Sequence, residues 1–141
     1  MTQPQTQTYA NPKFRWKAGI TGSLAGGLVF GMMMAMMGSL PMIAGLVGSS
    51  SAGIGFVVHL IISLVFGVTF SLFAGLVKWN GIVSGVIYGL ILWFLFPFIL
   101  MPMMMGMSEM AFQLTSASLM SLVGHVLYGA ITGFIYQRMS N

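Results

Sequence analysis

The chain has 141 residues, of which 57% are hydrophobic and only 4% are charged. A soluble domain carries about a quarter charged residues, so this composition excludes a fully hydrated surface and predicts that lipid covers much of the exterior. The formal charge of +4 comes from five scattered basic residues and one acid, which excludes a nucleic-acid-binding patch, and the lack of cysteine excludes disulfides and thiolate sites.

The chain begins with a polar segment and continues with apolar ones. Residues 1–15 are rich in Gln, Thr and Pro and are predicted to form a disordered cytoplasmic tail. Residues 16–141 are predicted to form a transmembrane domain, because about 20 apolar residues suffice to cross a bilayer core. The four predicted spans lie at residues 18–38, 54–77, 81–100 and 116–136.

Proline and glycine mark the ends of these spans. Pro41 follows the first span, and Pro97 is expected to kink or end the third. Residues 41–53 and 102–115 are predicted to be loops, and the second of these holds Glu109, the only acid in the chain. We therefore expect an all-α membrane protein with four transmembrane helices.

The charges predict the orientation. All five basic residues fall on one side of this arrangement, and by the positive-inside rule that side is cytoplasmic. They are Lys13, Arg15, Lys17, Lys78 and Arg138. Trp16, Trp79 and Tyr136 fall at the same boundary, where amphipathic rings are favoured. Both chain ends are therefore predicted to be cytoplasmic, in a bacterial or archaeal inner membrane.

The sequence also repeats itself. Residues 16–77 resemble residues 78–138, which predicts two similar hairpins in a four-helix bundle, with a pseudo-twofold axis along the membrane normal. The matching residues are Gly19, Ser23 and Gly27 with Gly81, Gly85 and Gly89, and His59, Ser63 and Gly67 with His125, Gly129 and Gly133.

These matching residues recur every four positions, so each predicted helix carries a stripe of small side chains. Such stripes allow helix backbones to approach closely in a membrane, and packing is the preferred interpretation. The alternative is that the smooth faces accommodate a flat cofactor.

His59 and His125 are the only histidines, and both fall within predicted spans on small-residue faces. Ionisable groups inside a membrane are costly and usually functional. The repeat places the two imidazoles opposite each other, where they could ligate a b-type haem or a metal. The alternatives are proton or solute handling and simple hydrogen bonding.

Fifteen methionines gather mainly in two groups near the predicted outer face. Thioethers are soft ligands that suit Cu(I), and pairs four residues apart share a helix face. Met33 with Met37 and Met103 with Met107 are the candidate metal-binding pairs. The alternative is that methionine fills irregular apolar gaps.

No phosphate-binding loop, metalloprotease helix or Ser/His/Asp set is found, and a single carboxylate cannot supply a two-carboxylate mechanism. The sequence therefore predicts that the protein is not an enzyme.

From His59 onward the chain resembles the YagU-like family of small bacterial inner-membrane proteins. The resemblance, over residues 56–138, rests on the His59-to-Phe66 segment, on Trp79-Asn80-Gly81, on a proline-containing third span and on Gly124-His125 before a basic end. It implies an inner-membrane protein and no particular reaction. The chain departs from the family in a shorter, less polar connection between the first two spans and in the absence of a third-span histidine.

Three hypotheses about function follow, of which the third is a purely structural partner of other membrane subunits. The first is a non-enzymatic module or an accessory subunit of a membrane complex, with haem b or Cu(I) bound at His59 and His125. The second is a small channel or a proton or solute permeation protein that uses the paired histidines. Other membrane subunits, or a second copy in a homodimer, are the expected partners besides lipid.

Overall fold

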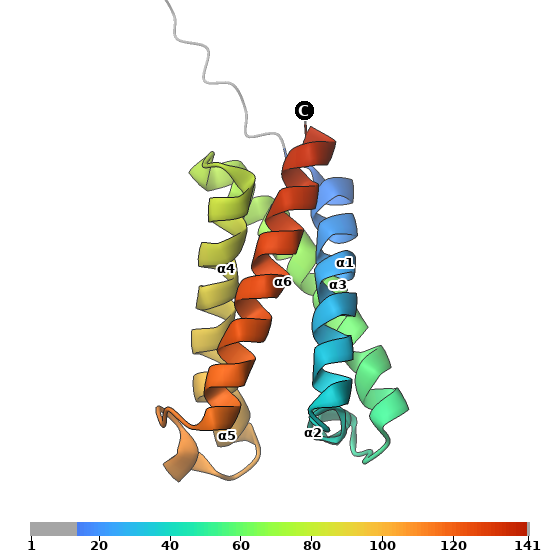
Figure 1. Ribbon diagram of the computed structural model, residues 1–141, viewed down its shortest axis with the longest axis vertical. Helices are drawn as coiled ribbons and strands as arrows, with labels where there is room; N and C mark the ends of the chain where they lie inside the picture. The colour runs from blue at the N-terminus through green and yellow to red at the C-terminus, as the bar shows by residue number, and fades with distance from the viewer. Residues whose placement is uncertain (1–13, 141) are drawn as a thin grey trace, which may run out of the picture.

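The computed structural model describes residues 14–140, so almost all of the predicted tail lies outside the described residues. Within these residues, four helices are long and apolar enough to cross a membrane (Figure 1). They are α1 (Trp16–Met36), α3 (Ala52–Val77), the segment from α4 (Gly81–Leu95) through to Met104, and α6 (Ser116–Ser140). No strand occurs within residues 14–140. The prediction of an all-α, four-helix membrane protein is confirmed.

The start of α1, the α3–α4 turn and the end of α6 lie at one end of the molecule (Figure 1). We call it the basic end, because Arg15, Lys17, Lys78 and Arg138 belong to these segments. The other end holds Glu109 within η3 (Ser108–Met110), and we call it the Glu109 end.

Two of the three predicted boundary aromatics are exposed at the basic end. The exposed fractions of Trp16 and Trp79 are 41% and 55%. Tyr136 is only 9% exposed, because its ring packs edge-on against Phe70 at 5.3 Å between ring centroids. Tyr136 is therefore packed between helices near the basic end of α6, and its place at the membrane boundary stays a prediction.

The third span does not end at Leu100. The chain passes through a π-helical segment, η2 (Phe96–Leu100), into α5 (Met101–Met104). Pro97 has no N–H to donate, and a local π-helical turn is one way in which a membrane helix absorbs a proline. Such turns often occur at functional sites.

The predicted loop at residues 41–53 is partly helical. It contains α2 (Leu40–Ala44) and a 3₁₀ turn, η1 (Gly45–Val47). Helix α2 packs against the first turns of α3, where a Cβ on Gly55 would collide with the carbonyl oxygen of Leu40. The loop therefore folds back over the end of the bundle.

Side chains cap the helices after each turn. Asn80 Oδ1 accepts hydrogen bonds from the backbone N–H groups of Ile82 and Val83 at the start of α4. Thr115 and Ser118 form a reciprocal pair at the start of α6, with N–H-to-hydroxyl distances of 2.8 and 3.1 Å. These caps satisfy N–H groups that have no partner within their own helix.

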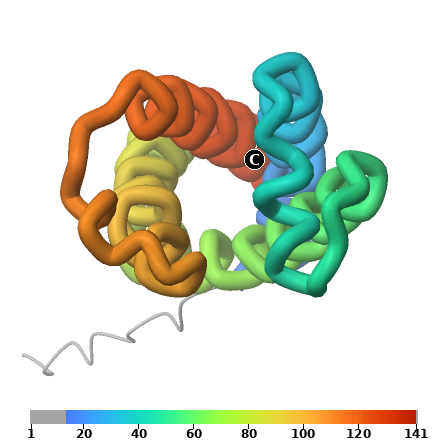
Figure 2. Tube along the Cα trace, turned by 90° about the horizontal axis from the view of Figure 1, so that it is seen from below, coloured from blue at the N-terminus to red at the C-terminus, as the bar shows by residue number. Residues whose placement is uncertain are grey.

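The helices are arranged in the order α3, α1, α6, α4 around the bundle (Figure 2). Helix α1 packs on both α3 and α6, and α6 packs on both α1 and α4. Helices α3 and α4 are joined by a short turn yet make few contacts with each other. The bundle is therefore closely packed on three sides and more open on the fourth.

Glycines make the close approaches. A Cβ on Gly81 would lie 2.5 Å from the carbonyl oxygen of Gly133, and one on Gly85 would collide with that of Gly129. In the other hairpin, a Cβ on Gly67 would lie 2.8 Å from the carbonyl oxygen of Gly19. These stripes face the backbone of a neighbouring helix, so they serve packing and not a flat cofactor.

A hydrogen-bonded cluster joins three helices near the middle of the bundle. Ser23 Oγ on α1 bonds to the carbonyl oxygen of Ser63 on α3 and to the hydroxyl of Tyr128 on α6. Thr132 Oγ1 donates to the carbonyl oxygen of Tyr128 at 2.7 Å, and Phe70 and Thr132 are fully buried beside it. This cluster and Phe70 therefore occupy the interior of the bundle on the side toward the basic end.

Candidate intramembrane ligand site

A cavity of about 460 Å³ lies in the half of the bundle nearer the Glu109 end. Its walls are apolar except for a few groups, chiefly His59, Ser63, Ser121 and His125. Ligand sites are typically cavities of roughly 300–1,000 Å³ with apolar walls and a small number of placed polar groups. The cavity therefore has the form of a binding site for a mostly apolar molecule.

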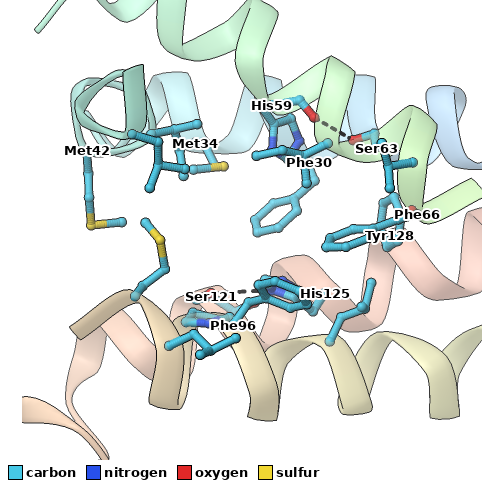
Figure 3. A pocket seen from close by; sticks show the side chains of 18 of the residues that line it. Phe30, Met34, Met42, His59, Ser63, Phe66, Phe96, Ser121, His125 and Tyr128 are labelled. Carbon is cyan, nitrogen blue, oxygen red and sulfur yellow. Dashed lines mark hydrogen bonds between the residues drawn. The ribbon is translucent and has the colours of Figure 1, made fainter. Parts of the chain in front are cut away.

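Both sequence-predicted histidines line this cavity (Figure 3). His59 comes from α3 and His125 from α6, so each hairpin supplies one imidazole. Within residues 14–140 no cluster of three or more His, Cys, Asp and Glu side chains could hold a metal ion. Any ligation in the cavity would therefore depend on the two imidazoles and on non-acidic neighbours.

His59 is 8% exposed and is fixed by helix α1. Its Nε2 lies 3.0 Å from the carbonyl oxygen of Gly27. A carbonyl can only accept, so Nε2 carries the hydrogen and Nδ1 of the neutral ring keeps a lone pair. A Cβ on Gly31 would lie 3.1 Å from Cδ2 of the same ring. The Cδ2–Nε2 edge therefore faces α1, and the edge that carries Nδ1 is turned away from it.

His125 is fixed by its own helix. Its Nδ1 lies 2.8 Å from the carbonyl oxygen of Ser121, one turn earlier in α6. Nδ1 therefore carries the hydrogen, and Nε2 at the tip of the ring keeps the lone pair. Histidines that bind metals commonly donate their other ring N–H to a backbone carbonyl, which fixes the ring and its tautomer. The arrangement suits His125 for ligation through Nε2.

Phe30 of α1 lies between the two imidazoles (Figure 3). Its ring centroid is 5.4 Å from that of His59 and 4.9 Å from that of His125, both in edge-on contacts. The ring also fills the space beside Gly124, where a Cβ would collide with it. One ligand atom cannot bind both imidazoles while Phe30 occupies this position.

The methionines that line the cavity are not those of the predicted pairs. Neither Met33 nor Met103 lines it. Met103 and Met107 do not share a helix face, because α5 ends at Met104 and Gly106 then turns the chain with a φ of +72°. The thioethers that line the cavity belong to Met34, Met42, Met101 and Met104.

A smaller cavity of about 180 Å³ adjoins the first on the Glu109 side. The two share Phe30, Met34, Met42, Pro97, Met101 and Ser121 in their walls. The smaller one also includes Met37 and Met107, together with polar residues such as Ser39 and Gln113. Two of the four predicted methionines therefore lie near the histidine cavity without lining it.

Sequence reasoning did not identify Phe30 or Tyr128 as site residues. Phe30 lies three residues after Gly27, and Tyr128 lies three residues after His125. This spacing puts each near the face of its helix that carries the small residue or the histidine. Helical spacing from the histidine pair was therefore the available signal.

The sequence profile of a family described as "Protein of unknown function (DUF1440)" matches residues 45–134, well over half of the chain. The chain belongs to the DUF1440 family. The matched region contains both histidines and the α3–α4 turn, and it overlaps the residues that resemble the YagU-like family, a resemblance that stays a prediction. No curated protein and no solved structure matches this DUF1440 protein.

Proposed function

We propose that this protein is a non-enzymatic module of a bacterial or archaeal inner membrane, with the basic end in the cytoplasm. The positive-inside rule supports this orientation, because Arg15, Lys17, Lys78 and Arg138 share one end. The similar glycine contacts of the two hairpins support a common origin as an internal repeat. An accessory role beside other subunits, or in a homodimer, belongs to the same proposal.

The proposed activity is ligand binding in the histidine cavity. One observation carries it: His59 and His125 share a cavity, and each has one ring nitrogen bonded to a backbone carbonyl and a lone pair on the other. Two such imidazoles bind a metal centre or accept hydrogen bonds from a ligand. If the histidines served only to hydrogen-bond the helices, the one ring nitrogen of each that bonds to a backbone carbonyl would suffice, and the cavity beside them would have no role.

Haem b is the first candidate ligand. Its macrocycle needs apolar walls, and its iron takes an imidazole as axial ligand. His125 is the better proximal ligand, because its Nδ1–H is held by the carbonyl oxygen of Ser121. Ligation by both histidines requires Phe30 to turn out of the space between them.

Cu(I) is the second candidate, and the methionine side chains favour it. Four thioethers line the same cavity as the two imidazoles, and soft ligands of this kind select Cu(I). The metal site proposed here therefore combines His59 and His125 with Met34, Met42, Met101 and Met104, in place of the predicted pairs.

Absorption spectra of the purified protein, oxidised and reduced, together with metal analysis of the same sample, test the proposal. Cells should be grown with a haem precursor in one culture and with added copper in another. A Soret band that is lost in His125→Ala identifies haem, and bound copper that is lost in Met34→Leu or Met101→Leu identifies the soft-metal site. Matched exposed variants, Met36→Leu and Met139→Leu, should retain the copper. A colourless, metal-free protein from both cultures contradicts both ligands.

Permeation stays a prediction. It requires a polar path through the bundle, and toward the basic end the cavity is followed by the Ser23–Tyr128 cluster and buried Phe70. A pH-dependent flux in liposomes that disappears when both histidines are replaced would favour it over the proposed binding function.

A further inference from the structure

Helices α3 and α4 hold together only in part of their length. The hydroxyl of Tyr88 on α4 donates to the carbonyl oxygen of Phe66 at 3.0 Å and lies 2.5 Å from Thr69 Oγ1. The rings of Phe66 and Phe96 are 5.0 Å apart. From there toward the Glu109 end the two helices diverge (Figure 1).

Where α3 and α4 diverge, residues on each of the two helices both line the cavity and are exposed on the surface. Ile61 and Val65 on α3 line the histidine cavity, and yet 59% and 53% of their surfaces are exposed. On the other edge, Phe96 and Leu100 line the cavity and are 36% and 40% exposed. Such high exposure of cavity-lining side chains along both edges indicates that the cavity reaches the surface between α3 and α4. We call this opening, bounded by these four residues, the α3–α4 slot.

The slot lies at the depth of the hydrocarbon. Ile61 and Val65 are near the middle of α3, which has 26 residues from Ala52 to Val77. A helix rises 1.5 Å per residue, so the centre of α3 lies at about the centre of the bilayer core. The slot is bordered by apolar side chains, and the molecules outside it at that depth are lipid chains.

The ends of the bundle offer poorer access. Toward the basic end, the Ser23–Tyr128 cluster and Phe70 fill the interior. Toward the Glu109 end, α2, η1 and α5 cover the cavity with Met42, Leu46 and Met104 among other side chains. The smaller cavity there contains polar groups and is the competing route for a ligand from water.

We infer that the histidine cavity is open to the bilayer through the α3–α4 slot, so that a lipid acyl chain reaches His59 and His125 and the ligand arrives by the same route. The part of this inference that concerns the ligand rests on the proposed binding function. It restricts the ligand class to membrane-dissolved molecules with an apolar body that offer the imidazoles a metal centre or a hydrogen-bond donor. Among the candidates it favours a macrocycle such as haem over a hydrated metal ion.

The chain has only two histidines, so protein labelled with ¹³C and ¹⁵N in histidine gives two sets of imidazole signals. The ligand-free protein in lipid nanodiscs is measured with phospholipid carrying a nitroxide in the middle of its acyl chain, and separately with a water-soluble gadolinium chelate. We expect the nitroxide lipid to broaden both imidazole signals and the chelate to leave them sharp. Broadening by the chelate, or by neither probe, overturns the inference.

Neighbouring residues on α3 provide matched variants. Val65 borders the slot, whereas Leu64 is 44% exposed at the same depth and does not line the cavity. Val65→Trp should remove most of the broadening by the nitroxide lipid, and Leu64→Trp should leave it unchanged. Val65→Ala should increase the broadening by the nitroxide lipid. This variant tests the slot if Val65→Trp does not fold. Equal broadening in all three variants overturns the slot as the route.

Because no cofactor is present, these measurements succeed or fail independently of haem or copper binding. A sealed cavity in a protein that binds haem would overturn the inference alone. An open slot in a protein that binds neither haem nor copper would support the inferred access route and contradict the two proposed ligands.

Discussion

The contact between α4 and α6 gives the most direct test of the packing. A Cβ on Gly129 would collide with the carbonyl oxygen of Gly85 and lie 2.7 Å from its carbonyl carbon. Carbon atoms in favourable contact are about 3.5–4.0 Å apart, so Gly129→Ala forces the helices apart by roughly 1 Å. Backbone atoms cannot rotate away as a side chain can, and the strain spreads along the whole contact.

The expected magnitude follows from two opposing effects. Overpacking costs about 1–3 kcal/mol, and alanine in place of glycine favours a helix by roughly 1 kcal/mol. The clash with backbone puts Gly129→Ala in the upper part of the overpacking range, so its net cost is about 1–2 kcal/mol. Gly53→Ala in α3 is the matched control, because the nearest atom to its Cβ is Ser51 Oγ at 3.7 Å.

The assay is reversible unfolding of the protein in mixed micelles as the fraction of denaturing detergent rises, followed by circular dichroism. Gly129→Ala should have a lower free energy of unfolding than the wild type, and Gly53→Ala should equal or exceed it. Combining Gly129→Ala with Gly85→Ala should cost less than the sum of both, because the first change has already separated the helices. Equal stabilities of Gly129→Ala and Gly53→Ala would refute the backbone-to-backbone contact.

Three further predictions concern single groups. Tyr88→Phe removes the hydroxyl that joins α4 to α3 and should lower the free energy of unfolding by about 0.6–1.7 kcal/mol, whereas an unchanged value would show that this bond does not hold the helices together. Ser23→Ala, measured in the same way, should destabilise by about 1 kcal/mol, while Ser84→Ala should be neutral or stabilising, because the buried Ser84 Oγ has no hydrogen-bond partner within residues 14–140. In protein reconstituted with haem, Phe30→Leu should convert a five-coordinate spectrum, with His125 as the ligand, into a six-coordinate one, and identical spectra would contradict the role of Phe30 as the separator.

Much of the fold was predictable because the bilayer imposes strict requirements. A span needs about 20 apolar residues with internally satisfied backbone groups, which leaves helices as the only solution for such segments. The four helices therefore agree with the predicted spans to within a few residues at most ends. The third span continues beyond the predicted end at Leu100. The sequence suggested that Pro97 could end this helix, whereas a π-helical turn accommodates the proline and the chain stays helical.

The candidate site was predictable only as residue types. The repeat and the small-residue stripes indicated that His59 and His125 face the interior, and both line one cavity. Helical spacing could not show that Phe30 separates the two rings, because this depends on how α1 and α6 approach each other at Gly124. For Met103 and Met107, the turn at Gly106 ends the helical spacing that would have put them on one face, while metal binding by either methionine pair stays a prediction.

The sequence by itself determined the environment, the number of spans, the grouping of charge at one end and the two residues able to act as ligands. These depend on composition and on spacing within single helices, which are local properties. Only the tertiary structure decided which ring nitrogen of each histidine keeps a lone pair, where Phe30 lies, and that α3 and α4 separate to leave an opening. Each of these depends on contacts between helices, and in a membrane such contacts are set by backbone approach at individual glycines and by a few hydrogen bonds, which no single segment specifies.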